Sequence, residues 1–212
     1  MSLAGGGGAG RRVVGHVRSV LRERLEARRA EIEAAALTRV RAIADPAEVA
    51  DPAYAEGLRA AVEAAVAYGI EATGRTPDEA PPIPVALLAQ ARMAARSGIP
   101  LDTVLRRYFA GYSLLGYFQI EEASRDGLIE GPELQRLIAA QAGVFDRLLA
   151  AIGEEHARES ELRHTTSERR HTERIERLLA GEPLDPAGIA YEFDGWHLGL
   201  LADGPGAERH VR

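Results

Sequence analysis

Apolar residues recur at three- and four-residue steps along most of this chain, and that spacing is typical of amphipathic helices. The first such stretch, residues 12–44, has Arg and Glu on its other face. It predicts one helix of about thirty residues, longer than the usual globular helix. We expect so long a helix to pack against a second copy of the chain.

Two shorter helices are predicted next, over residues 52–72 and 85–97. Asp51 precedes a proline, which disfavours helical geometry, and an Asp at that position caps the helix that follows. At the other end, Gly98 followed by Pro100 stops the second of these helices and allows another to begin.

Residues 98–127 are predicted to form the central helix of the fold. Their sequence, GIPLDTVLRRYFAGYSLLGYFQIEEASRDG, is apolar on nearly all sides and leaves only a narrow polar stripe. A helix with this pattern is normally buried among others. The sequence therefore predicts an all-α helical bundle, with a globin-like arrangement as one option.

A last and very long helix is predicted over residues 133–180, where no Gly-Pro signal interrupts the chain. Its first half carries enough large apolar residues to pack on the core. In its second half, residues 154–173 are dense in charges of both signs, with Leu162 as the only large aliphatic residue. We expect residues 153–180 to be a solvated rod or a two-chain coiled coil that links the bundle to a following unit.

The two ends of the sequence differ from this pattern. Residues 196–202 are aromatic and aliphatic and are bounded by Gly and Asp, as in a buried strand. One strand cannot be a domain, so we expect residues 181–212 to begin an α/β domain that is truncated here. Residues 1–11 are Gly-rich, and their GxGxxG spacing follows no strand, so we expect a disordered leader.

Composition narrows the functional classes. The net charge of −6 argues against a chain that mainly holds a phosphate backbone. The absence of Cys removes disulfides, thiol nucleophiles and thiolate metal sites, and is compatible with a reducing cytoplasm. No apolar run reaches the eighteen or so residues that span a bilayer. We expect a cytoplasmic protein that makes no membrane contact and, lacking any catalytic motif, is not an enzyme.

Residues 94–108 carry a helix-turn-helix-like pattern, with a small residue at Ala94, a turn at Gly98 and an apolar contact at Ile99. A recognition helix must present a polar face to the DNA groove, whereas this helix continues as YFAGYSLLGYF. The favoured interpretation is a tight corner between two core helices. Direct DNA binding through this corner is kept as an alternative.

Two glycines lie inside the central helix, and each costs about 1 kcal/mol relative to Ala at such a position. Either another helix backbone approaches closely there, as at a dimer contact, or the glycines open a small pocket. The candidate residues for this ligand pocket or dimer contact are Tyr108, Phe109, Gly111, Tyr112, Gly116 and Tyr117. The sequence does not choose between the two.

No catalytic residue, metal site or cofactor is predicted. His156, His164 and His171 lie on the polar half of the last helix, at spacings that metal sites on one helix seldom use, so we interpret them as solvated. Adjacent carboxylates such as Glu121-Glu122 point to different sides of a helix and cannot act together as acid and base.

Three blocks of the sequence carry a family resemblance: VAYGIEATGR, PPIPVALLAQARMAARSGIPLDTVLRRYFAGYSLLGYFQIEEA and ERRHTERIERLLAGEPLDPAGIAYEFDGWHLGLLADGPGA. Over residues 12–212 the chain resembles the N-terminal part of PucR-type (CdaR-like) bacterial transcriptional regulators. Their helical domain is similar to the N-terminal domains of stressosome RsbR-type proteins. It precedes a degenerate GGDEF-like α/β domain and a C-terminal helix-turn-helix.

The resemblance implies a helical sensor and dimerisation domain at residues 12–152, a linker helix at 153–180 and the start of a GGDEF-like domain at 181–212. A small-molecule or protein signal would favour one packing of a homodimer, and the long helix would pass that change to a DNA-binding domain beyond Arg212. The family implies no zinc, nucleotide or covalent site in the helical domain. A stressosome-like scaffold that binds partner proteins is the second interpretation.

Overall fold

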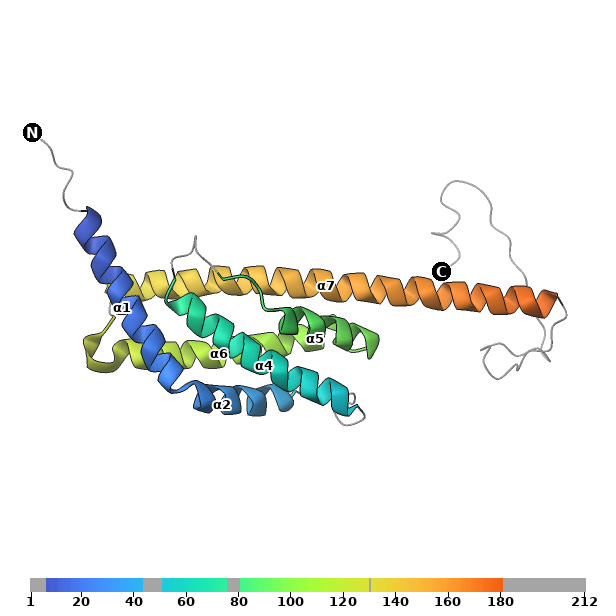
Figure 1. Ribbon diagram of the computed structural model, residues 1–212, viewed down its shortest axis with the longest axis horizontal. Coiled ribbons are helices and arrows are strands. Elements are labelled where there is room, and N and C mark those ends of the chain that lie inside the picture. Colours follow the sequence, from blue (N-terminus) through green and yellow to red (C-terminus); the bar gives the residue numbers. More distant parts are fainter. Residues whose placement is uncertain (1–6, 44–50, 76–80, 130, 181–212) are drawn as a thin grey trace, which may run out of the picture. The chain divides into compact units, whose positions relative to one another are not determined.

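The computed structural model describes residues 7–43, 51–75, 81–129 and 131–180, and this part of the chain is all-α. Its elements are α1 (Gly7–Ala27), α2 (Arg29–Arg41), α4 (Pro52–Thr73), α5 (Val85–Arg96), α6 (Leu101–Ser124), the 3-10 turn η2 (Arg125–Gly127) and α7 (Gly131–Leu179) (Figure 1). The predicted all-α bundle is confirmed. The strand predicted at residues 196–202 and the α/β domain predicted at 181–212 lie outside the described residues.

The α-carbon contacts divide the chain into one unit that ends at His164 and another that begins at Thr165, and α7 contributes to both. The first unit contains all the other helices of the described part of the chain. Because α1 begins at Gly7, residues 7–11 are helical and do not belong to a disordered leader. Within the described ranges, no helix combines the length and the apolar character needed to cross a membrane.

The single helix predicted over residues 12–44 is wrong, because the chain bends at Arg28. This residue has φ −102° and ψ 9°, and α1 and α2 run in different directions from it (Figure 1). Buried Leu25 and Ile32 lie on either side of the bend, so that an arginine occupies the core position between them. Both helices contact α4 and α6 of the same chain. The apolar stripe is thus covered without a second copy, contrary to the prediction from its length.

Local signals place the start of α4 and the end of α5 within one residue of the prediction, whereas α6 is shorter than the predicted 98–127. The Asp51 carboxylate accepts a hydrogen bond from the Ala53 N–H at 2.9 Å and caps α4. Gly98, with φ 74°, ends α5, and the Ile99 N–H donates to the Ala94 carbonyl at 2.9 Å. This i to i−5 bond is typical of a Schellman motif. Residues 94–108 therefore form a tight corner between α5 and α6.

The core of the first unit consists of two apolar clusters. One lies between α1, α2, α4, α6 and the start of α7, and includes Leu21, Ile32, Ile70, Leu115 and Phe118. The other lies between α4, α5, α6 and α7, and includes Tyr54, Leu87, Val104, Phe145 and Ile152. Because α4 and α6 contribute to both, they connect the two halves of the bundle.

Helix α6 is not buried on all sides, which corrects the prediction made from its composition. Val104 and Leu115 belong to its buried stripe, but Phe109, Tyr117 and Ile120 are 51%, 65% and 47% exposed. Helices α1, α2, α4 and α5 pack against the other faces of α6. A partly open apolar face therefore remains on the outside of the bundle.

Candidate functional site

An apolar cavity of about 90 Å³ lies inside the first unit. Residues of α2, α4, α5, α6 and α7 line it, and most of its wall is aliphatic or aromatic, as with Val40, Val62, Leu115 and Leu148. Apolar cavities with a few polar groups are the usual form of small-molecule sites. The cavity is therefore the candidate binding site of the bundle.

Three of the six predicted site residues line this cavity: Tyr108, Gly111 and Tyr112. The Tyr112 ring stacks on Phe145 of α7 with centroids 4.0 Å apart, and the Tyr108 hydroxyl donates to the Leu87 carbonyl at 3.5 Å. Burial raises the pKa of both tyrosines, and for Tyr112 the nearby carboxylate of Asp146 adds to the effect. Both phenols are therefore neutral near pH 7.

The other three predicted residues, Phe109, Gly116 and Tyr117, do not line the cavity. Phe109 and Tyr117 are on the partly open face of α6, and Phe109 also meets Phe145 edge-on with centroids 5.0 Å apart. The structure thus divides the predicted set into an inner group and an outer group.

Neither glycine of α6 is explained by close helix packing within the chain. A Cβ added at Gly111 or at Gly116 would find no heavy atom within 4 Å. Close packing of α4 against α6 instead depends on Gly69, since a Cβ at Gly69 would lie 2.2 Å from Leu115 Cδ2. Gly69 is not among the predicted site residues, although its position three residues after Val66 places it on the buried stripe of α4.

Buried polar side chains that are not among the predicted site residues also line the cavity. Gln90 is 6% exposed, and neither its Nε2 nor its Oε1 has a hydrogen-bond partner in the described part of the chain. The Arg107 guanidinium donates to the Tyr54 hydroxyl at 3.2 Å and to the Ile43 carbonyl at 2.9 Å. Gln90 could have been noticed as a polar residue three positions after Leu87 on an otherwise apolar stripe.

A polar cluster around Thr73 joins α4, α6 and α7 next to the cavity. Thr73 is fully buried, and its hydroxyl donates to the Gly69 carbonyl at 2.9 Å. The same oxygen accepts from Gln119 Nε2 at 2.8 Å and from Gln141 Nε2 at 2.9 Å. Gln141 also lines the cavity, so this cluster fixes one part of its wall.

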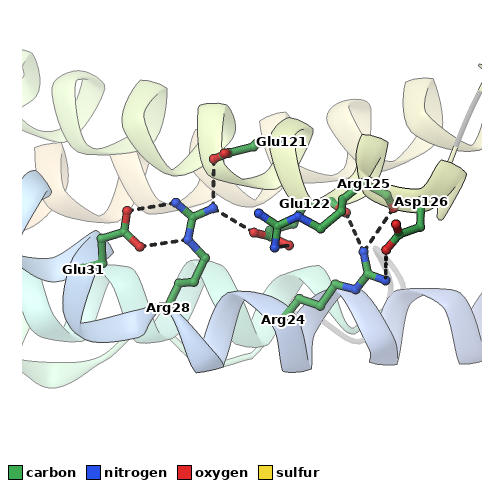
Figure 2. A network of polar contacts seen from close by, with 7 residues as sticks. All are labelled: Arg24, Arg28, Glu31, Glu121, Glu122, Arg125 and Asp126. Atoms are coloured by element: carbon green, nitrogen blue, oxygen red, sulfur yellow. Dashed lines mark hydrogen bonds and ion pairs between the residues drawn. The ribbon is translucent and has the colours of Figure 1, made fainter.

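The bend at Arg28 is held by a network of charges (Figure 2). Arg28 donates to Glu31 with two bonds of 2.9 Å, to Glu121 at 2.9 Å and to the fully buried Glu122 at 2.7 Å. Its guanidinium also lies over the Phe118 ring, 4.5 Å from the centroid. The network therefore fastens the junction of α1 and α2 to the C-terminal end of α6.

Polar contacts hold α7 to α5 beyond residue 152. Glu155 pairs with Arg92 at 2.5 Å and Glu159 with Arg96 at 2.7 Å, and the neighbouring guanidinium lowers the pKa of each carboxyl. His156 is buried, and its Nε2 donates to the Ile99 carbonyl at 2.9 Å.

The prediction of solvated histidines is therefore wrong for His156, because that position on α7 faces the corner between α5 and α6. His164 is exposed as predicted, and the side chain of His171 is outside the described ones. Among the side chains that the structure describes, no group of three His, Asp or Glu could hold a metal ion.

Comparison with known protein families shows to which family the helical bundle belongs. The family model described as RsbT co-antagonist protein rsbRD N-terminal domain matches residues 30–171, two thirds of the sequence. No curated protein and no solved structure matches the chain. The match runs from α2 into α7 and so contains the cavity, and it confirms the resemblance to RsbR-type helical domains. The chain belongs to the rsbRD N-terminal domain family.

Proposed function

We propose that this chain is the sensory and dimerisation module of a bacterial transcriptional regulator of the PucR/CdaR type. Its family membership supports the coarser statement, that it is a helical signalling module related to the stressosome proteins. The observation that carries the proposal concerns α7. Val144, Phe145 and Leu148 line the cavity, and the same helix continues without interruption to Leu179 in the second unit.

The mechanism is a population shift between two packings of α7. A signal that changes the packing at Phe145 or Leu148 changes the position of α7 relative to α5. Beyond the cavity, α7 is held to α5 mainly by ion pairs such as Arg96–Glu159, with side chains 63% and 17% exposed. Partly exposed ion pairs contribute little to stability, so alternative pairings cost little. The chain takes no catalytic role in this mechanism.

Dimerisation is assigned to the outer face of α6. Phe109, Tyr117 and Ile120 expose apolar surface there, and Gly116 lies on the same helix with open space where a Cβ would be. A glycine in a helix interior without a packing role inside the chain fits the close approach of a second backbone. Sedimentation equilibrium should give a dimer for the wild type and a monomer for Tyr117→Glu. A wild-type monomer would contradict this assignment.

A deletion in a longer protein that contains this chain tests the sensory function. Removal of residues 12–152 should leave promoter binding by the following domains but abolish its regulation. If the chain is instead a stressosome-like scaffold, the deletion should reduce the size of the protein's native complex and leave no promoter-bound species in either form.

Direct DNA binding by residues 94–108 is disfavoured by burial. Thr103, Val104 and Arg107, at the front of α6, are all buried, and exposed Arg106 pairs with Asp102 at 3.2 Å. A recognition helix needs its front residues free to enter the groove. An electrophoretic shift assay with this chain alone should therefore show no sequence-specific complex.

A further inference from the structure

We propose that the cavity is the binding site of a small, neutral and mainly apolar molecule that carries one hydroxyl or amide group, with Gln90 as its polar contact. This inference names the class of signal for the module and rests on the proposed function only for the signalling role. The binding itself is a property of the first unit alone.

The first observation is that Gly111 leaves a core position empty. It follows Val104 by seven residues and precedes Leu115 by four, so it is on the buried stripe of α6. A side chain at this position would point toward the other cavity-lining helices, yet no heavy atom lies within 4 Å of its Cβ position. The neighbouring side chains have not closed over the gap, and the space belongs to the cavity.

The second observation is the state of the Gln90 amide. It lines the cavity, is more than nine-tenths buried, and has no hydrogen-bond partner for either polar atom within the described ranges. A buried amide without partners is unfavourable, and native structures rarely keep one without a reason. A ligand hydroxyl can donate to Oε1 or accept from Nε2, and a ligand amide can do both.

Gly57 leaves room for this amide beside α4. A Cβ at Gly57 of α4 would lie 2.6 Å from Gln90 Oε1, so the glycine makes room for the amide at the α4–α5 contact. Gly111 therefore opens the cavity, and Gly57 makes room for the Gln90 amide.

The size and charge of the cavity limit the ligand. An engineered cavity of about 150 Å³ in another protein binds benzene, so about 90 Å³ admits a short branched chain or, at most, a single small ring for which the surrounding side chains shift slightly. Among the described residues, no carboxylate lines the cavity, and the one charged side chain there, Arg107, already donates to the Tyr54 hydroxyl and the Ile43 carbonyl. A cationic ligand would lose its hydration without gaining a counter-charge, and the Arg107 guanidinium is already engaged with these protein oxygens, so the ligand that we propose is neutral.

Phenol and benzene are matched probes, because they differ by one hydroxyl. In an amide NMR titration of the whole chain, phenol should bind the wild type with a dissociation constant in the low millimolar range or below. It should shift the amide signals of cavity residues, and benzene should bind at least tenfold more weakly. Gln90→Leu should remove the preference for phenol but retain benzene binding.

Gly111→Leu should abolish the binding of both probes, whereas Gly143→Leu, at an exposed position of α7 with open space around it, should leave both unchanged. If Gly111→Leu does not fold, Gly111→Ala should still weaken both probes at least threefold. The absence of cavity shifts with phenol in the wild type would overturn the inference, as would equal binding by Gly111→Ala. Binding without any effect on regulation in the longer protein would instead contradict the signalling mechanism and leave the site intact.

Discussion

The Thr73 hydroxyl makes hydrogen bonds to α4, α6 and α7, so its removal is a sharp perturbation of the bundle. Thr73→Val keeps nearly the same shape in a fully buried position, so it creates no cavity. It leaves the Nε2 donors of Gln119 and Gln141, now at 2.8 and 2.9 Å from Thr73 Oγ1, without that acceptor.

The expected loss in the free energy of unfolding follows from these two donors. A buried donor without a partner costs about 1–3 kcal/mol, which gives about 2–6 kcal/mol for the pair. Gln141 Nε2 keeps the Gly69 carbonyl at 3.5 Å, which offsets part of its loss. We therefore expect the lower half of the range, about 2–4 kcal/mol, or about 4–16 °C in Tm for a chain of this size.

Urea unfolding followed by circular dichroism measures the effect. Thr73→Ser is the matched control, because it keeps the hydroxyl and loses one methyl group, at a cost of about 1 kcal/mol. If Thr73→Val is no more destabilising than Thr73→Ser, the three-helix hydrogen bonding described here is not a stabilising feature.

Three further predictions concern stability. Gly69→Ala should lower the free energy of unfolding by about 1–3 kcal/mol through overpacking, whereas Gly143→Ala, at an exposed position of α7, should raise it by up to about 1 kcal/mol through helix propensity; equal changes would contradict the packing role of Gly69. Arg28→Met should lower Tm clearly more than Arg29→Met, whose exposed pairs contribute little, and a smaller effect would contradict the network at the bend. The folded-state pKa values of Glu155 and Glu159 are lowered, so the stability that these carboxylates contribute is present above about pH 4.5 and is lost as the pH falls below it. Arg96→Gln should flatten this pH dependence of Tm in thermal melts between about pH 6 and 3.

The sequence predicts best where the chain's local chemistry decides the structure. Asp51 before a proline and Gly98 before Ile99-Pro100 place the helix ends within one or two residues, because capping and the left-handed conformation depend only on neighbouring residues. The bend at Arg28 could not be predicted in this way. Leu25 and Ile32 are seven residues apart, about two helical turns, so the apolar stripe keeps its phase across the bend.

Only part of the candidate site could be predicted from the sequence. Gly111 and its aromatic neighbours can be identified as unusual, but whether the space beside a glycine is filled depends on Val144 and Leu148, which come from a distant helix. His156 shows the same limit. Its charged neighbours in the sequence suggest a solvated position, but its environment is set by the Ile99 carbonyl across the bundle.

The central claim is that α7 passes a change in the bundle to the domains that follow, and insertions between His164 and Thr165, at the boundary of the two units, test it most directly. A helical insertion of seven residues rotates the following part by about 700°, within about 20° of two full turns, whereas two residues rotate it by about 200°. In a longer protein that contains this chain, regulated transcription should survive the seven-residue helical insertion. It should be lost with the two-residue insertion and with seven residues of Gly and Ser. Equal regulation by all three would contradict transmission through α7.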